Sequence, residues 1–165
     1  MKQISDIIFQ PCSPSMLRQA LEIWNQVIAD GLAFVYDEPY TEEEFAAMAA
    51  AQTALYCAMS QGQLAGFYIL HPNFPARVKH IGNASYAVHP GFRGRGIGRL
   101  LAEHSLAKAK GLGFDAMQFN AVVKTNKAAN HLWQSLGFNP IGEVPAAFRL
   151  DSGEKVPLVL YYKKL

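Results

Sequence analysis

Cysteines, signal-like segments and long apolar runs are scarce or missing in this sequence. Its 165 residues include only two cysteines, Cys12 and Cys57, which is too few for a disulfide framework and typical of a reducing compartment. The first residues, Met-Lys-Gln-Ile-Ser-Asp, lack the apolar core of a signal peptide. No run approaches the roughly 20 apolar residues that span a bilayer. We therefore expect a cytoplasmic protein that does not use the membrane.

An excess of one charge is also missing. The chain has 15 basic and 13 acidic residues, for a net charge of +2, and no lysine or arginine block stands apart from one glycine-rich loop. Neither nucleic acid nor an anionic membrane is therefore expected as a partner. Half of the residues are apolar, enough for a sizeable core at this length. Without linkers or repeats, residues 1–165 are predicted to form a single domain.

The most informative stretch covers residues 88–101 and reads Val-His-Pro-Gly-Phe-Arg-Gly-Arg-Gly-Ile-Gly-Arg-Leu-Leu. It follows an apolar run and opens a segment with helical spacing, so the pattern predicts a strand, a glycine-rich turn and a helix. Glycines let a ligand approach the free amides at the start of a helix, a place that binds anions. Nearby arginines add positive charge, so the expected ligand carries phosphates. These residues are Gly94, Gly96 and Gly98 with Arg93, Arg95 and Arg99.

Two common nucleotide-binding loops are excluded because each lacks a required residue. Gly91 and Gly96 have the spacing of the first two Walker A glycines, but Ile97 stands where that motif needs its lysine. A dinucleotide fingerprint beginning at Gly94 has Arg99 at its third glycine position. The phosphates therefore belong to another kind of ligand.

Two motifs together resemble one family. The hexad Arg93-Gly94-Arg95-Gly96-Ile97-Gly98 resembles the (Arg/Gln)-x-x-Gly-x-(Gly/Ala) pyrophosphate loop of the GCN5-related N-acetyltransferases, the GNAT superfamily. Asn126-x-x-Ala129 followed by Leu132-Trp133-x-x-Leu136-Gly137-Phe138 resembles the family's second cofactor-contacting motif. The resemblance covers about residues 53–138. The alternative is an ordinary glycine-rich surface turn before a helix.

The hydrophobic pattern predicts seven strands and four helices. Strands are expected at about 6–10, 53–60, 64–70, 81–88, 116–123, 138–144 and 156–164, and helices at about 14–30, 41–48, 97–110 and 126–136. The pattern alone indicates only α plus β. The resemblance implies an α/β (α+β) fold of the GNAT kind, in which a mixed, mostly antiparallel sheet of about seven strands is flanked by four helices.

The resemblance also implies acetyl-CoA as cosubstrate, no metal, and a set of cofactor contacts. In the family the pantetheine arm follows the backbone of the fourth strand, and the pyrophosphate lies on the glycine-rich loop. Sheet packing is the alternative role for the strand residues. The implied contacts are Tyr86, Ala87, Val88, Arg93, Gly94, Arg95, Gly96, Ile97, Gly98, Arg99, Asn126, Ala129, Asn130 and Trp133.

Three asparagines are the candidate catalytic residues. Asn83 and Asn120 lie in apolar strands, where asparagine is depleted. Together with Asn126 and its surroundings they resemble the branch typified by the yeast L-azetidine-2-carboxylate N-acetyltransferase. In that branch the matching asparagines hold the substrate and polarise the acetyl group. The alternatives are a hydrogen-bonded pair between strands for Asn83 and Asn120, and a helix cap for Asn126.

The usual acid and base of such an enzyme are missing. Trp133 stands where many GNAT enzymes have a tyrosine acid, and an indole N–H does not serve as an acid. The thiolate then leaves unaided or takes a proton from water. His80 and the pair Asp37 and Glu38 are candidate bases, with solvated surface charges as the alternative. Cys57 as a thioester-forming nucleophile is weighed against a small buried hydrophobe.

We therefore expect an N-acetyltransferase that moves an acetyl group directly from acetyl-CoA to the amine of a small molecule, an amino acid or similar compound. The connection at residues 32–40 is the candidate lid over the acceptor. Two alternatives stay open: acetylation of a protein N-terminus or lysine, and a non-catalytic acyl-CoA-binding module. The small amine is the expected partner, and we allow for a homodimer.

Overall fold

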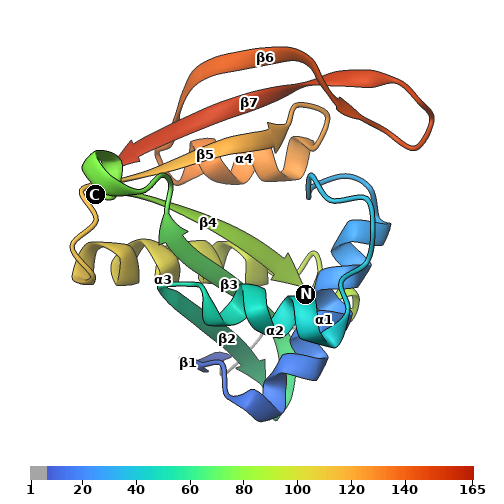
Figure 1. Cartoon of the computed structure of the whole chain (residues 1–165), viewed down its shortest axis with the longest axis vertical. Coiled ribbons are helices and arrows are strands. Elements are labelled where there is room, and N and C mark those ends of the chain that lie inside the picture. The colour runs from blue at the N-terminus through green and yellow to red at the C-terminus, as the bar shows by residue number, and fades with distance from the viewer. Residues whose placement is uncertain (1–6) are drawn as a thin grey trace.

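The computed structural model describes residues 7–165 of the chain. Asp6, the first residue of the expected first strand, lies outside this part. Within it, seven strands and four α-helices follow the expected order (Figure 1). They are β1 (Ile7–Pro11), α1 (Leu17–Ala29), α2 (Glu42–Ala50), β2 (Ala54–Ser60), β3 (Gln63–Pro72), β4 (Ile81–Val88), α3 (Ile97–Gly111), β5 (Ala116–Val123), α4 (Lys127–Ser135), β6 (Asn139–Arg149) and β7 (Lys155–Lys164).

All seven strands join one sheet in the order β1-β2-β3-β4-β5-β7-β6. Each neighbouring pair is antiparallel except β4 and β5, which run parallel. Helices α1 and α2 cover one face and share a core with Cys57, Phe67 and Ala87. Helices α3 and α4 cover the other face (Figure 1). The predicted mixed, mostly antiparallel sheet between four helices is confirmed.

Local sequence signals begin each helix. Thr41 and Glu44 form the capping box of α2, because the threonine side chain accepts from the backbone N–H of Glu44 and the glutamate accepts from the backbone N–H of Thr41. Gly96 precedes α3 with φ +85°, which favours glycine. Asn126 caps α4 by accepting from the backbone N–H of Ala129 at 3.1 Å.

Two elements differ from the expectation. Residues Pro14–Met16 form a 3-10 turn, and α1 begins only at Leu17, because Ser13 makes no side-chain cap. The expected strand at 138–144 continues as β6 to Arg149, with a register irregularity between Val144 and Phe148. Almost every residue of β6 is exposed, so the alternation of buried and exposed residues that marks a strand is absent.

The parallel pair β4 and β5 is the feature that positions the site. Only Ile81 with Ala116 and Gly82 with Met117 are paired, and beyond Gly82 the two strands diverge. On its other edge β4 stays paired with β3 along its length, from Gly82 to Val88. The sheet is therefore open along one edge of β4, between its first two residues and the glycine-rich loop.

Gly66 lies where the chain of β3 approaches the backbone of β4 closely, and a substitution there tests this approach. A Cβ at this position would lie 2.7 Å from the backbone oxygen of Ala87 and 3.2 Å from the Cα of Val88, and a central backbone cannot give way cheaply. We expect Gly66→Ala to lower the free energy of unfolding by about 2 kcal/mol, measured by denaturant titration. Gly142→Ala is the matched control, since its Cβ would meet open space. Equal stability of the two variants would contradict the close approach.

Candidate functional site

The site begins at the free edge of β4. In a strand, alternate residues turn their N–H and C=O groups to opposite edges, so half of the backbone groups of Ala84 to Val88 face the gap left by β5. Such groups need partners, and an extended ligand lying in the gap would supply them. The contacts expected at Tyr86, Ala87 and Val88 are of this backbone kind.

Trp133 holds the two strands apart on the face covered by α3 and α4. Its ring centroid lies 5.0 Å from that of Tyr86 on β4 and 4.5 Å from that of Phe119 on β5. It also packs against Phe138 and is only 7% exposed. Trp133 is thus a packed wall behind the gap, which agrees with the absence of an acid at this position. Its direct contact with the cofactor stays a prediction.

The side chain of Tyr86 points away from the gap toward α3. Its hydroxyl donates to the Oγ of Ser105 at 2.8 Å, because Ser105 itself donates to the backbone oxygen of Ala102. Burial raises the pKa of the Tyr86 phenol. Tyr86 is therefore neutral at physiological pH and contributes to the gap through its backbone.

The glycine-rich loop lies where β4 ends and α3 begins. Gly94 and Gly96 have φ of +72° and +85°, and a Cβ on either would meet only open space. The amides here are thus accessible from outside, at the N-terminus of a 15-residue helix. Buried Ile97 anchors the loop to the core.

The three loop arginines differ in their present partners. Arg93 pairs with Asp30 at 2.7 Å and donates to the backbone oxygen of Val88 at 3.3 Å. Arg99 contacts Glu103 and Ser135 on the outer side of α3 and α4. Arg95 lies over the ring of Phe92 at 5.5 Å. Arg95 is therefore the arginine whose guanidinium is most available for a phosphate.

The second motif mostly organises the start of α4. Asn126 caps the helix, and its Nδ2 donates to the backbone oxygen of Leu32 at 3.4 Å. Asn130 donates to the backbone oxygens of Val123 and Asn126 and accepts from the hydroxyl of Tyr161. The amide of Asn130 is thus used within the protein, which favours a structural role for it. Cofactor contacts by Asn126, Ala129 and Asn130 stay predictions.

Asn83 and Asn120 meet through a third asparagine that the sequence did not point to. The Oδ1 of Asn73, in the connection before β4, accepts from the Nδ2 of Asn83 at 3.1 Å and from that of Asn120 at 2.6 Å. Gln118 donates to the Oδ1 of Asn120 at 2.9 Å. The alternative of hydrogen bonding between the strands is therefore present in this structure, and the catalytic role of these asparagines stays a prediction.

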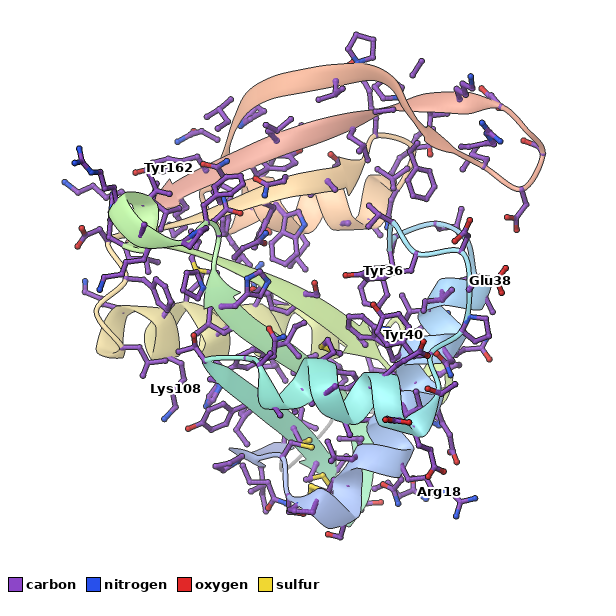
Figure 2. The ribbon with its side chains drawn as sticks, viewed as in Figure 1. Arg18, Tyr36, Glu38, Tyr40, Lys108 and Tyr162 are labelled. Carbon is purple, nitrogen blue, oxygen red and sulfur yellow. The ribbon has the colours of Figure 1, made fainter. Side chains whose placement is uncertain are left out.

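The connection between α1 and α2 closes the other side of the gap. Figure 2 shows Tyr36 and Tyr40 on its inner side and Glu38 turned outward. Trp24 packs on both tyrosines, with ring centroids 5.9 Å from each. Asn25, which the sequence analysis missed, makes two hydrogen bonds to the backbone of Tyr40. Burial, followed by the neighbouring Tyr36, raises the pKa of Tyr40 to about 12.

The candidate bases are exposed at the surface. His80 is exposed before β4, and its backbone oxygen accepts from Asp115. Asp37 is exposed, and Glu38 faces outward (Figure 2). Cys57 is fully buried, with a thiol pKa raised by Cys12 and by burial, which fits a packing residue. The exposure of His80, Asp37 and Glu38 agrees with the alternative of solvated surface charges, and a role for any of them as a base stays a prediction.

Residues 7–165 also contain a groove away from the gap, and they offer neither a cluster of metal ligands nor a membrane-spanning helix. A groove of about 470 Å³ lies between α1, the β2–β3 turn and residues 89–92, but its lining contains none of the expected contacts, so the gap between β4 and β5 is the better candidate. In the same part of the chain, no group of three His, Cys, Asp or Glu side chains is placed to hold a metal ion. None of the described helices has both the length and the hydropathy to cross a membrane.

Known proteins similar to this chain include several acetyltransferases. The sequence profile of the acetyltransferase (GNAT) family matches residues 19–138. N-acetyltransferase aca1 of Schizosaccharomyces pombe is 40% identical over 91 residues, which are 55% of this chain and 44% of that protein. A GCN5-related N-acetyltransferase structure from Kribbella flavida has a TM-score of 0.91 at 32% identity, covering 96% of this chain and 98% of that one.

More distant structures share the fold. A phosphinothricin acetyltransferase from Sinorhizobium meliloti, solved in complex with acetyl-CoA, has a TM-score of 0.91 at 20% identity and covers 98% of this chain and 89% of that one. At this identity the likeness extends to the fold alone. The match also spans less than half of the S. pombe relative, so the resemblance to the azetidine-2-carboxylate branch stays a prediction.

Gly96 tests the glycine-rich loop as the pyrophosphate site. We expect Gly96→Asp to weaken acetyl-CoA binding by at least about tenfold relative to Gly96→Ala, because both variants carry the strain of φ +85° but only aspartate adds a negative charge among the amides. Isothermal calorimetry measures the difference, and melting temperatures confirm folding. Arg93→Ala should weaken binding more mildly. Equal affinities of the two Gly96 variants would contradict the assignment.

Proposed function

This chain belongs to the acetyltransferase (GNAT) family, and we propose that it is an N-acetyltransferase that transfers the acetyl group of acetyl-CoA directly to the amine of a small molecule, an amino acid or a similar compound. One observation carries the proposal. The unpaired edge of β4 is followed in the chain by the accessible amides of Gly94 and Gly96 at the start of α3. One extended ligand can therefore contact the strand edge and the loop amides together.

The residues fit acetyl-CoA from its phosphates to its thioester. Loop amides and Arg95 bind the pyrophosphate by charge and hydrogen bonding. The free backbone groups of β4 bind the pantetheine amides and hold the thioester against the strand. Trp133 closes the gap behind it and keeps water out on that face. Acetyl-CoA itself supplies the activated acyl group.

The acceptor then approaches from the face covered by α1 and α2. Its amine must be neutral to attack the thioester carbon, forming the C–N bond as the C–S bond breaks, and the amine proton passes to solvent. A backbone N–H of β4, or the amide of Asn126, donates to the oxyanion. The thiolate leaves without a side-chain acid or takes a proton from water, because Trp133 offers none.

A small acceptor is favoured over a protein chain by the connection between α1 and α2. Its Leu32 reaches the cap of α4 through a hydrogen bond between the Leu32 oxygen and the Nδ2 of Asn126, across 94 residues of sequence. Asn25 fixes Tyr40 at the other end. This bridge narrows the approach on the acceptor side, whereas a protein substrate requires an open groove.

Free-thiol release with a panel of amines tests the function. The panel should contain amino acids, simple alkylamines, an N-terminal peptide and a lysine peptide. Turnover confined to small amines supports the proposal, and faster turnover of a peptide supports the protein acetyltransferase alternative. Tight acetyl-CoA binding without turnover of any amine would identify the non-catalytic acyl-CoA-binding module instead.

Trp133 should act as a wall and not as an acid. We expect Trp133→Phe to lower the free energy of unfolding by about 1–2 kcal/mol, because a smaller ring leaves a void, and to keep most of kcat together with the alkaline limb of the pH profile. Phe138→Leu, a change in a neighbouring ring of the same core, is the control for lost packing. A hundredfold fall of kcat in folded Trp133→Phe alone would refute this role.

Asn126 tests whether a cap also serves as an oxyanion donor. Asn126→Ser keeps the cap of α4, so the melting temperature should change little. As the shorter hydroxyl does not reach where the amide did, kcat should fall by about a hundredfold or more if the amide stabilises the oxyanion. Melting temperature and kcat are measured on one preparation. Near-normal kcat would leave the backbone of β4 as the oxyanion donor and reduce Asn126 to a cap.

A further inference from the structure

The two cysteines of the chain lie beside one another on the sheet, outside the site described above. Cys57 is in β2, opposite Gln10 of β1, and Cys12 follows the last residue of β1. The backbone N–H of Cys12 donates to the oxygen of Leu55 at 2.9 Å, so the antiparallel pairing continues by one residue. Cys12 is therefore the diagonal neighbour of Cys57 across the two strands.

Both cysteine side chains point to the face of the sheet that α1 and α2 cover. Alternate residues of a strand project to the same face, so Cys12 shares the face of Gln10, which stands opposite Cys57. Cys57 is fully buried in the core under α1, whereas Cys12 packs against the same core and stays partly exposed. The pair thus combines one thiol within reach of solvent with one enclosed thiol.

The two thiols interact with one another. A hydrogen bond from the Cys57 thiol to the Cys12 sulfur lowers the pKa of Cys12, against the opposite effect of its burial. Cys12 in turn raises the pKa of Cys57, together with burial. The thiolate is the form of cysteine that attacks electrophiles. Cys12 is therefore the reactive member of the pair, and Cys57 holds the proton.

The high pKa of Cys57 does not persist once Cys12 is modified. A Cys12 sulfur bonded to another sulfur carries no negative charge and accepts hydrogen bonds weakly, so burial alone then raises the pKa of Cys57. Diagonal neighbours have Cα atoms roughly 7 Å apart, at the upper end of the span that a disulfide bridges. Because Cys12 lies beyond the end of β1, a small shift of its backbone is enough to join the two sulfurs.

We propose that Cys12 and Cys57 form a thiol-modification site, at which a low-molecular-weight disulfide oxidises the pair to an intramolecular disulfide. The Cys12 thiolate attacks one sulfur of the reagent, forms a mixed disulfide and releases a thiolate, which takes a proton. The Cys57 sulfur gives up its proton, attacks the Cys12 sulfur and releases the second thiol. Two electrons and two protons thus pass from the protein to the reagent, which becomes two thiols.

The disulfide closes a loop that contains the acceptor side of the protein. Residues 12–57 include α1, the connection at residues 32–40, and α2. Joining the two ends of this segment lowers the entropy of the unfolded chain, and the effect grows with the length of the loop. Oxidation therefore stabilises the fold around the acceptor side and leaves the gap between β4 and β5 untouched. This property does not depend on the acetyl transfer proposed above.

Glutathione disulfide is the probe for this site. Native protein treated with it at neutral pH should lose two hydrogens by mass spectrometry, retain no glutathione, and melt at least roughly 5 °C higher until dithiothreitol reverses the change. A peptide map should place the bond between Cys12 and Cys57. Lack of reaction, glutathione retained on Cys12, or a dimer linked through Cys12 would overturn the proposal. A disulfide form whose melting temperature fails to rise would overturn it as well, because its bond would be strained.

Two single variants separate the roles of the thiols. Cys57→Ala should keep one glutathione on Cys12, because the second step lacks its attacking sulfur, and should react more slowly, because Cys12 loses the hydrogen bond that favours its thiolate. Cys12→Ser should take up no glutathione, since Cys57 is enclosed. Circular dichroism of the reduced proteins confirms that both variants fold. Modification of folded Cys12→Ser, or an unmodified Cys57→Ala, would contradict the assigned order of attack.

Discussion

The divergence of β4 from β5 is the constraint on which the rest of the structure depends. After two paired residues on each strand, Trp133 fills the space between Tyr86 and Phe119 on one face. On the other face, Asn73 joins the two strands at the point where they separate. Trp133 thus packs between the two strands where they are unpaired, and the hydrogen bonds of Asn73 lie where the gap starts. The free edge of β4 extends from this point to Val88, where the strand ends.

Elements with strong local signals were predicted well from the sequence. The bounds of β4 and β5 are confirmed, because each is a short apolar run that ends at a glycine-rich or polar turn. The capping box at Thr41 is also confirmed. The extension of β6 to Arg149 was missed, because its course depends on pairing with β7 and on a positive φ at Ala146, neither of which leaves a periodic pattern.

The parts of the candidate site that are local in sequence were predicted, whereas the parts that depend on long-range contacts were not. The glycine-rich loop is contiguous in sequence, so its glycines and arginines predict an anion site without knowledge of the fold. The hydrogen bond between Asn73 and Asn120 joins residues that lie 47 positions apart in the sequence, and the one between Leu32 and Asn126 joins residues 94 positions apart. Such contacts exist only once the sheet has formed. An asparagine in an apolar strand indicates that its side chain needs a hydrogen-bond partner. It does not indicate which residue provides that partner.

The aromatic and amide side chains beside the gap are neutral, in contrast to the arginines of the glycine-rich loop. Burial raises the pKa of Tyr86 and brings that of Tyr40 to about 12, so both phenols keep their protons at physiological pH. Asn73, Asn83, Gln118 and Asn120 do not titrate at all. Beside the gap, the side chains therefore act on a ligand through fixed dipoles, which need no change of protonation. In the proposed reaction the proton that must move belongs to the amine, so the ionisation of the acceptor would govern the rate.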